Sequence, residues 1–505
     1  MNNPITRRRL LLTSCAAGAA VWAGSARSTT AVAAGLDYDG RDAFDLAEQA
    51  FLGQGFTDNE GGGYAWGASY YLLGLLRMYE AYEDQDYLDR FADYAGEVLD
   101  RTDDARGVTD YGGRSGTVWR AAGNYTAGHG TVVDAASEPA VQLRWAGTQS
   151  AATTGEITAG PGDRFTLALS NPGTETLTLT DVSLDPDDDR YIVSVVNAAY
   201  RTNARWTAVD LRSTPAPAAP GSGVIAFEPQ YYVFAVHTGM ISYPLAKYAR
   251  IVLGSPALAE GRHGGQARRI LAAVRRAVAF HDHEFVQRPD GTGDYVFTRG
   301  APIPFDGTIE PYNQSHGLGQ TCAELYRLTG EKRYRTTIDA MLAAFEHGLA
   351  PGGPEEATSW SYWPVNSELY RGYAADEEIS DYTPSFTPSQ QIEDISHAAI
   401  SVEFVAAAAD AGVERATALL PRFVATYRDH VVRSDTEVWL RVDGTTDAAA
   451  SSAVQCARWV VCSRLDDEVY RHGLRLYDAV QLEPDQGSHA LGIGYLNWGR
   501  KKGWA

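Results

Sequence analysis

Apolar residues recur at helical spacing through most of the chain. In the first such stretch they fall at Phe44, Ala47, Ala50 and Phe51, which share one face of a helix. Similar stretches follow, joined by short polar turns, and this pattern predicts paired helices. The further segments expected to be helical are 70–82, 87–99, 234–253, 265–285, 315–328, 334–348, 395–411, 413–432, 448–462 and 466–479.

Two of the turns have the same tyrosine-to-tyrosine spacing. Tyr79 to Tyr87 and Tyr326 to Tyr334 each connect two helical stretches, which indicates a weak repeat of a helical hairpin. About eleven or twelve helices are enough to close a ring of roughly six hairpins. We therefore expect a mainly α fold, an (α/α) toroid or incomplete barrel, whose loops cluster at one end and line a cleft.

The periodicity changes from helical to alternating between about Val132 and Pro220. Strands are expected at 141–145, 163–169, 176–179 and 191–195, separated by turns rich in Gly, Pro and Asp. Because helical segments flank this region on both sides, we interpret it as an inserted antiparallel β-sandwich-like module. The predicted organisation is a first toroid part at 35–131, the β module at 132–222, and a second toroid part with the active-site loops at 223–505.

The first 34 residues resemble a targeting segment. Arg7, Arg8 and Arg9 precede an apolar stretch, and small residues at 31–34 form a cleavage site, as in a twin-arginine signal peptide. A competing interpretation is a lipoprotein box that ends at Cys15, which would then carry a lipid. Both predict export, either as a secreted protein or anchored through Cys15. No later apolar run is long enough to span a membrane.

Composition and charge narrow the possible partners. Of the 505 residues, 44% are hydrophobic and 21% are charged, which is typical of a soluble globular protein. The formal net charge is −21, and removing the segment 1–34, with its four arginines, makes it more negative. This argues against a nucleic-acid partner. Because the four cysteines form no C-x-x-C pair and no H-E-x-x-H occurs, we expect no metal and no cofactor.

The segment 393–397 crowds titratable groups at the start of a predicted helix. Asp394 and His397 are one turn apart and share a face, next to Glu393. The loop before it carries Tyr362 and Trp363, whose flat faces suit sugar rings. This composition is typical of a carbohydrate-processing cleft. The alternative is an acidic first helical turn with a core histidine.

Other clusters have equally ordinary alternatives. The segment 310–316 places Tyr312, Asn313 and His316 at a helix start, where they could also be a cap and a buried tyrosine. Trp66 could be a stacking platform or core, and His237 a ligand-binding or a core histidine.

Taken together, these segments resemble a family of exported helical-toroid proteins that includes polysaccharide lyases acting on glucuronan and alginate. The resemblance covers most of the helical portion and leaves the β insertion uncovered. The motifs that carry it are Trp66-Gly67-x-Ser69-Tyr70, His237-Thr238-Gly239-Met240, Pro311-Tyr312-Asn313-Gln314, Tyr362-Trp363-Pro364 and Glu393-Asp394-Ile395-Ser396-His397-Ala398.

The resemblance implies a lyase that cleaves a uronic-acid-containing polysaccharide by metal-independent β-elimination. Tyr312 and His316 would transfer protons, while Asn313 and His397 would neutralise or orient the carboxyl group and Arg371 would bind its charge. We accordingly expect Tyr312, His316 and His397 to be catalytic. We expect the substrate to be an acidic polysaccharide or oligosaccharide. The residues expected to bind it are Asn313, Arg371, Trp363, Tyr362, Trp66, His237, Glu393 and Asp394.

Related toroids also carry other activities, so alternatives stay open. A glycoside hydrolase would use two carboxyl groups across the scissile bond, chosen from Glu310, Glu368, Asp381, Glu393 and Asp394. A uronyl epimerase would use the same scaffold. A non-catalytic surface glycan-binding protein would need only the aromatic residues and the β module.

Overall fold

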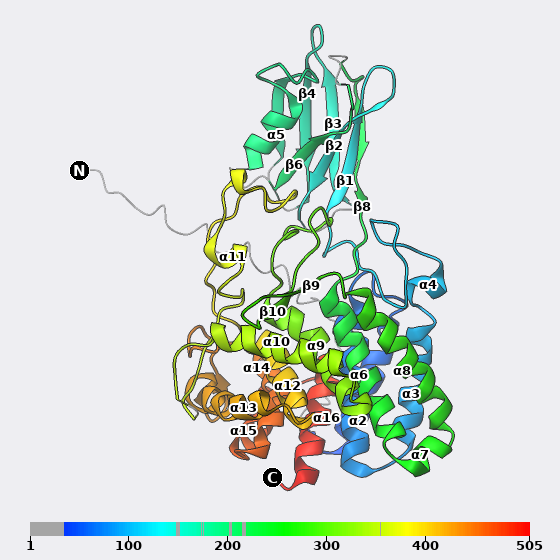
Figure 1. Cartoon of the computed structure of the whole chain (residues 1–505), viewed down its shortest axis with the longest axis vertical. Helices are drawn as coiled ribbons and strands as arrows, with labels where there is room; N and C mark the ends of the chain where they lie inside the picture. The colour runs from blue at the N-terminus through cyan, green and yellow to red at the C-terminus, as the bar shows by residue number, and fades with distance from the viewer. Residues whose placement is uncertain are drawn as a thin grey trace, which may run out of the picture. The chain divides into compact units, whose positions relative to one another are not determined.

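The computed structural model describes residues 35–147, 152–172, 174, 176–200, 205–214, 219–353 and 355–504. The predicted signal segment and Cys15 lie outside these residues. The described residues form two compact units, one from the ranges 121–232 and 302–306 and a larger one from the ranges 35–120, 233–301 and 307–504. As expected, the chain is mainly helical with small antiparallel sheets (Figure 1).

Six helices of the larger unit contact one another in a closed cycle. We call them the inner helices. In the order of their contacts they are α2 (Ser69–Tyr82), α6 (Ala235–Leu253), α9 (Tyr312–Thr329), α12 (Ile395–Asp410), the 3₁₀-helix η5 (Val454–Arg464) and α16 (Gly487–Lys502), which contacts α2 again.

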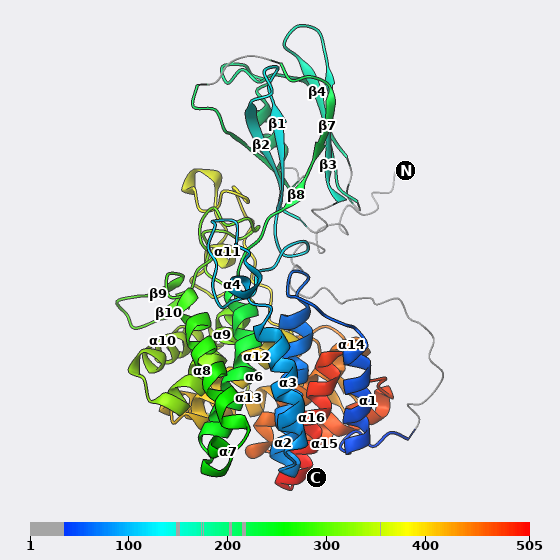
Figure 2. The ribbon, with the colours of Figure 1, turned by 90° about the vertical axis from the view of Figure 1, so that its right-hand side faces the viewer.

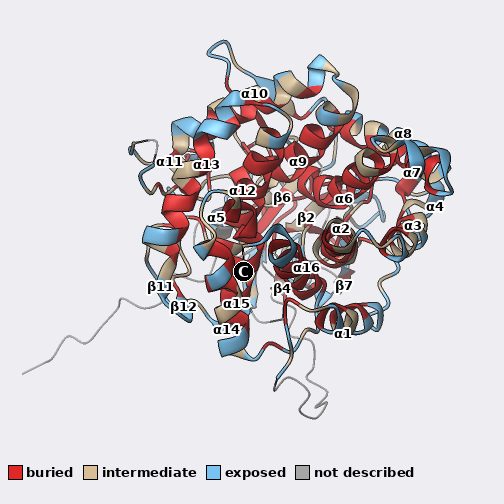
Figure 3. Cartoon of the chain, turned by 90° about the horizontal axis from the view of Figure 1, so that it is seen from below, coloured by how far each residue is buried: buried red, intermediate tan, exposed pale blue. Residues whose placement is uncertain are grey.

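Each inner helix also packs against one outer helix. In the same order these are α3 (Asp86–Leu99), α8 (His263–Phe280), α10 (Lys332–Gly348), α13 (Glu414–Thr426), α15 (Glu468–Val480) and α1 (Arg41–Leu52). Figure 3 shows buried residues concentrated on α2, α6, α9, α12 and α16, and exposed residues on helices such as α1, α8 and α10. Shorter helices lie in the connections: α4 (Asp103–Arg106), α7 (Pro256–Glu260), α11 (Glu368–Arg371) and α14 (Ala450–Ala453).

The sequence explains which helices are inner and which are outer. Helix α12 has apolar residues around most of its circumference and is buried over most of its length, which suits a helix surrounded by others. Helix α3 buries only one face, which contains Tyr87, Phe91 and Val98. Close packing between inner helices requires glycine at Gly239, because a side chain there would clash with the backbone of Gly317 on α9.

A buried polar network joins the inner helices. The Arg77 guanidinium on α2 lies 3.4 Å from Glu403 Oε1 on α12, and Tyr243 of α6 donates a hydrogen bond to the same oxygen (3.1 Å). Tyr495 of α16 also donates to Glu403. The guanidinium further pairs with Glu80 (2.8 Å). Four inner helices therefore share one ion-paired carboxylate, which restricts their relative rotation.

The smaller unit contains two four-stranded antiparallel sheets. Their strand orders are β6-β2-β1-β8 and β5-β4-β3-β7, and Figure 2 shows β1 and β2 on one side and β3, β4 and β7 on the other. Apolar residues that alternate along the strands fill the core, as at Phe165, Leu167 and Leu169. The strands are β1 (Gly128–Val133), β2 (Pro139–Trp145), β3 (Thr154–Ala159), β4 (Phe165–Ser170), β5 (Leu177–Val182), β6 (Trp206–Asp210), β7 (Gly223–Ala226) and β8 (Glu228–Pro229).

One predicted strand is wrong. The apolar run at 191–195 begins helix α5 (Ile192–Tyr200), which buries Ile192 and Val196 four residues apart in the core of this unit. Its β-branched residues favour a strand locally, but burial of one helical face decides the outcome. The compact unit also begins before, and ends after, the expected segment 132–222.

Two short hairpins belong to the larger unit. They pair β9 (Phe285–Gln287) with β10 (Gly293–Tyr295), and β11 (Val432–Ser434) with β12 (Glu437–Val438). In the part of the chain that the structure describes, no helix has both the length and the apolar character that membrane crossing requires.

We predict that Arg77→Met strongly destabilises the larger unit. The substitution leaves Glu403 buried without its cation, so the free energy of unfolding should fall by about 3–5 kcal/mol in a chemical denaturation experiment. The matched control is Arg428→Met, because the Arg428 side chain is 55% exposed in its pair with Asp429. That control should cost only about 0–1 kcal/mol. Equal effects of both substitutions would contradict the role given to the network.

Candidate active site

The segment before α12 is held in place by backbone hydrogen bonds on both sides. The Glu393 N–H donates to the Trp360 carbonyl (3.0 Å), and the Val442 N–H donates to the Glu393 carbonyl (3.1 Å). Asp394 then caps the helix, because its side chain accepts from the N–H groups of Ser396 (3.0 Å) and His397 (3.1 Å). The position of these side chains is therefore set by the backbone.

Glu393, Asp394 and His397 form one cluster, which we call the Glu393 site. His397 Nδ1 lies 2.6 Å from Asp394 Oδ2 and 4.0 Å from Glu393 Oε1. The side chains of Asp394 and His397 are 18% and 14% exposed, whereas Glu393 is fully buried. Glu393 Oε1 accepts from the Asp394 N–H (3.0 Å), and its Oε2 has no hydrogen-bond partner among the described residues.

The two adjacent carboxyl groups are held in opposite protonation states. Burial raises the pKa of Glu393 to about 8, so this carboxyl keeps its proton at neutral pH. Burial also opposes ionisation of Asp394, but the charge and hydrogen bond of His397 outweigh it and lower the pKa of Asp394 to about 2. Burial disfavours the charged form of His397 as well, but the charge and hydrogen bond of Asp394 outweigh it and raise the pKa of His397 to about 9. At neutral pH the site holds a carboxylic acid, a carboxylate and an imidazolium.

The protonated state of His397 disfavours metal binding at this site. One potential ligand atom from each of the three side chains lies within 4.8 Å of the others, a spacing that a metal ion could bridge. A protonated imidazole cannot ligate, however, and binding would have to displace that proton. The site is therefore better suited to holding and moving protons.

A chain of contacts connects this site to the starts of α2 and α6. Arg458 of η5 donates to the Ser396 carbonyl (3.1 Å), and its guanidinium lies 4.9 Å from the centre of the Tyr70 ring. Tyr70 contacts Trp66, which in turn lies edge to face with His237 (centroids 5.5 Å apart). The predicted residues Trp66 and His237 therefore lie at the same end of the inner helices as His397.

Trp66 and His237 differ in exposure. Trp66 is partly exposed, and its Nε1 is buried and has no hydrogen-bond partner among the described residues. His237 is 1% exposed, pairs with Asn59 (3.1 Å), and burial lowers its pKa to about 3. Trp66 is thus the more accessible of the two to a sugar, and His237 supports it from the interior.

The loop that precedes α12 and carries Tyr362 and Trp363 contributes one partly exposed ring to the Glu393 site. Tyr362 contacts His397 edge to face (centroids 5.6 Å apart), next to the buried Trp363. Trp360 lies in the core against Phe345, with its Nε1 unpartnered among the described residues. Tyr362 is therefore the aromatic residue of this loop that lies directly at the Glu393 site.

Tyr312 and His316 lie in the interior. Each is 1% exposed, and the two rings pack against each other and against Phe345. His316 Nδ1 lies 2.9 Å from Ser401 Oγ, and burial lowers its pKa to about 3. Tyr312 donates to the Ala344 carbonyl (3.3 Å). A substrate cannot reach either side chain in this conformation, so their surroundings favour a packing role.

Arg371 is already paired. Its guanidinium lies 2.8 Å from Glu377 and donates to the Gly372 carbonyl (2.9 Å), and the side chain is 49% exposed. These partners belong to its own loop. The expectation that Arg371 binds a substrate carboxylate therefore has no support from its contacts.

Buried polar atoms without partners gather at the starts of α9 and α12. Beyond Glu393 Oε2, they include Asn313 Oδ1 and both carboxyl oxygens of Glu310 within the described part of the chain. Burial, with the nearby carboxylates of Glu284 and Asp294, raises the pKa of Glu310 well above its usual range. Such groups are rare in folded proteins and mark positions where water or a ligand is expected.

Two contributors to the site were missed in the sequence. Arg458 supports Ser396 and Tyr70, and Arg441 donates to the Ile392 carbonyl (2.8 Å). Arg458 had a usable signal, because it is a lone charge in the apolar run 454–462 and a buried arginine requires partners. Arg441 lies in a loop without a pattern, and nothing in the sequence indicated its position.

We predict that His316→Leu reduces stability and leaves catalysis intact. The variant loses the bond to Ser401, so the free energy of unfolding should fall by about 1–3 kcal/mol. Turnover per folded molecule, measured on whichever glycan the wild type cleaves, should stay within a small factor of the wild-type rate. A loss of about a hundredfold or more at normal stability would restore His316 as a proton-transfer residue.

Comparison with known proteins finds a distant structural similarity and no match in sequence. No protein family and no curated protein sequence matches it. Among solved structures it is similar to a selenomethionine derivative of the GH76 alpha-mannanase of Bacteroides thetaiotaomicron, with 12% identity and a TM-score of 0.31. The match covers 48% of this chain and 60% of that chain. It is also similar to a family 76 glycoside hydrolase from a bovine Bacteroides thetaiotaomicron strain (10% identity, 67% of this chain and 75% of that chain, TM-score 0.30). The chain thus has distant structural similarity to glycoside hydrolases of family 76.

Proposed function

We propose that the larger unit is an (α/α) toroid and that the Glu393 site is the active centre of a glycoside hydrolase. The observation that carries this proposal is the adjacent carboxyl pair, one group protonated with a pKa of about 8 and the other ionised with a pKa of about 2. Two carboxyl groups with separated pKa values are what acid-assisted glycoside hydrolysis requires.

The roles follow from protonation and hydrogen bonding. Glu393 donates the proton of its unpartnered Oε2 to the departing glycosidic oxygen. Asp394 supplies the negative charge that stabilises or attacks the positively charged sugar carbon, and His397 keeps Asp394 ionised. Because Glu393 is fully buried, the side chains that cover it must shift when a sugar binds.

The spacing of the carboxyl groups bears on stereochemistry. Oxygen atoms of Glu393 and Asp394 lie within 4.8 Å of each other. A separation below this bound leaves no room for the water that inverting glycosidases hold between carboxyl groups roughly 6.5–9.5 Å apart, and it favours the closer arrangement of retaining enzymes. The proposed reaction therefore retains the anomeric configuration.

A uronate lyase is the second candidate, and one contact favours it. The Tyr362 ring lies against His397, whose raised pKa keeps it cationic and able to bind a substrate carboxylate. A tyrosine and a cationic imidazole are groups that β-elimination can use without a metal. In that mechanism Tyr362 replaces the buried Tyr312 as the proton-transfer residue.

We predict that the protein releases reducing ends from a neutral glycan without forming an unsaturated product. The full chain is incubated with α-mannan, β-glucan and xylan, and in parallel with alginate and polyglucuronate, and both reducing ends and ultraviolet absorbance are followed. Hydrolysis creates reducing ends alone, whereas elimination adds a conjugated double bond that absorbs. An absorbing product from a polyuronate would overturn the hydrolase proposal in favour of the lyase.

Two conservative substitutions test the proposed roles within this assay, and a third serves as the control. Glu393→Gln removes the acid, and Asp394→Asn removes the charge while keeping a residue that can cap α12. Each should lower the rate by about 10²–10⁴ with little loss of stability. Glu414→Gln, at an exposed position on α13, should leave the rate unchanged. Full activity of the Glu393 variant would show that the acid is another residue.

A further inference from the structure

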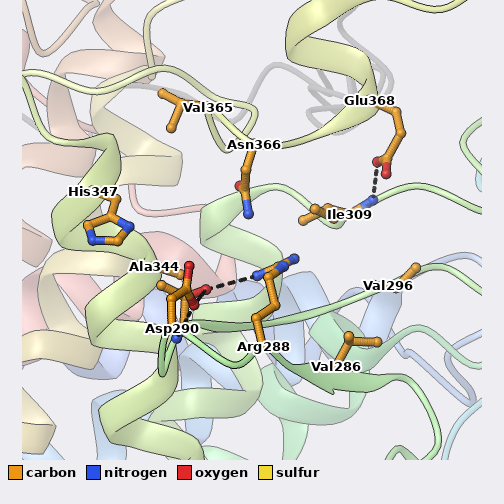
Figure 4. Close-up of a pocket in the computed structure, with 11 residues that line it drawn as sticks. Val286, Arg288, Asp290, Val296, Ile309, Ala344, His347, Val365, Asn366 and Glu368 are labelled. Carbon is orange, nitrogen blue, oxygen red and sulfur yellow. Dashed lines mark hydrogen bonds between the residues drawn. The ribbon is translucent and has the colours of Figure 1, made fainter.

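A cavity of about 400 Å³ lies in the larger unit, away from the residues assigned above to the reaction. Its walls come from the β9–β10 hairpin, the end of α10 and the loop after Pro364 (Figure 4). The volume falls within the roughly 300–1,000 Å³ of small-molecule sites. The polar side chains that line it include Arg288, Asp290, His347, Asn366 and Glu368.

The walls of this cavity are fixed by hydrogen bonds. Glu368 Oε2 accepts from the Ile309 N–H (3.0 Å), and Asp290 Oδ1 accepts from the Thr292 N–H (2.9 Å). The buried Tyr312 hydroxyl donates to the Ala344 carbonyl and accepts from the Val365 N–H, so it ties two walls together. The cavity is therefore part of the fold, with Tyr312 as its support.

Two polar side chains of the lining are exposed to a ligand. His347 and Asn366 line the cavity, and Figure 4 shows both together with Val365. The Asn366 amide also donates a hydrogen bond to Asp294, which leaves its remaining donor and acceptor for a ligand. An imidazole and an amide supply both hydrogen-bond donors and acceptors. Val286, Val296 and Ile309 supply apolar surface. Mixed donors and acceptors beside apolar patches suit the hydroxyl groups and C–H faces of a sugar.

The charges of the lining disfavour an acidic sugar. Asp290 and Glu368 are carboxylates, and the Arg288 guanidinium is already bound to the buried Asp294 (2.6 Å). A uronate in the cavity would meet two negative charges and no unpaired guanidinium among the lining residues. The net charge of −21 also repels a polyanionic substrate.

The cavity is connected to the Glu393 site by one short loop. Tyr362 contacts His397, and Val365 follows it by three residues. A chain of that length spans at most about 11 Å, given about 3.6 Å for each residue. An oligosaccharide bound at the Glu393 site could therefore reach the cavity with a neighbouring unit.

We propose that this cavity is a subsite that binds a neutral sugar unit of the substrate chain and rejects a uronic acid. The inference rests on the proposed function, because it takes the Glu393 site as the place of bond cleavage. It makes His347 and Asn366 specificity-determining residues. Neither residue participates in the chemistry.

The test follows two histidines by NMR in the full chain. The eleven histidines are labelled with ¹³C in the ring, and the His347 and His397 signals are assigned with the variants His347→Gln and His397→Gln. The probes are methyl α-mannopyranoside, methyl β-glucopyranoside and methyl β-glucuronoside. We expect the neutral glycosides to shift the His347 signal to saturation, and the glucuronoside to leave it unchanged.

A blocking variant makes the test specific. Val365→Trp fills the opening and should abolish the His347 shift, whereas Leu465→Trp, at a 55% exposed position elsewhere, should preserve it. Thermal unfolding of both variants shows whether they fold. A shift that survives Val365→Trp in the folded variant, the absence of any shift with neutral glycosides, or a shift with the glucuronoside would each overturn the proposal.

The two signals separate this proposal from the proposed function. A shift of His397 without His347 would retain the Glu393 site as a sugar site and overturn the cavity subsite. A shift of His347 without His397 would support the cavity as a neutral-sugar site and contradict binding at the Glu393 site.

Discussion

The ion pair between Arg77 and Glu403 is the constraint on which the rest of the larger unit depends. It lies inside a closed cycle of inner helices, where an unpaired charge would be costly. Tyr243 and Tyr495 bring two further helices to the same carboxylate. Because the network restricts helix rotation, it also fixes which side chains meet at the helix starts. The geometry near His397 is a consequence of this arrangement.

Carboxyl groups buried in the same fold receive different numbers of hydrogen-bond donors. Glu403 has a guanidinium and two hydroxyl donors, so it is stabilised as a buried acceptor. Among the described residues Glu393 has one backbone donor, the Asp394 N–H, and it keeps a proton instead, while its neighbour Asp394 is ionised by His397. The difference lies in the number of donors supplied, which is why a structural carboxylate and a reactive carboxyl can be formed from the same residue type.

Periodicity and local spacing predicted most helices and one side-chain contact, but they could not predict which polar side chains are buried. Helical spacing predicted most inner and outer helices, and the one-turn spacing of Asp394 and His397 predicted their contact. Helix α16 was missed, because its glycine-rich, aromatic sequence lacks a clear apolar stripe. The polar motif at the start of α9 could not show that Tyr312 and His316 face the interior, since exposure depends on the packing of distant segments.

The central claim is that Glu393 keeps a proton that Asp394, one residue away, has lost. Difference infrared spectroscopy of the carboxyl C=O band, recorded while the pH is raised, measures this in the wild type and in Glu393→Gln. We predict that the wild type loses a protonated-carboxyl band at a pH of about 8 and that the variant lacks this change. If both proteins give the same spectra across that range, Glu393 is already ionised and the proposed acid does not exist.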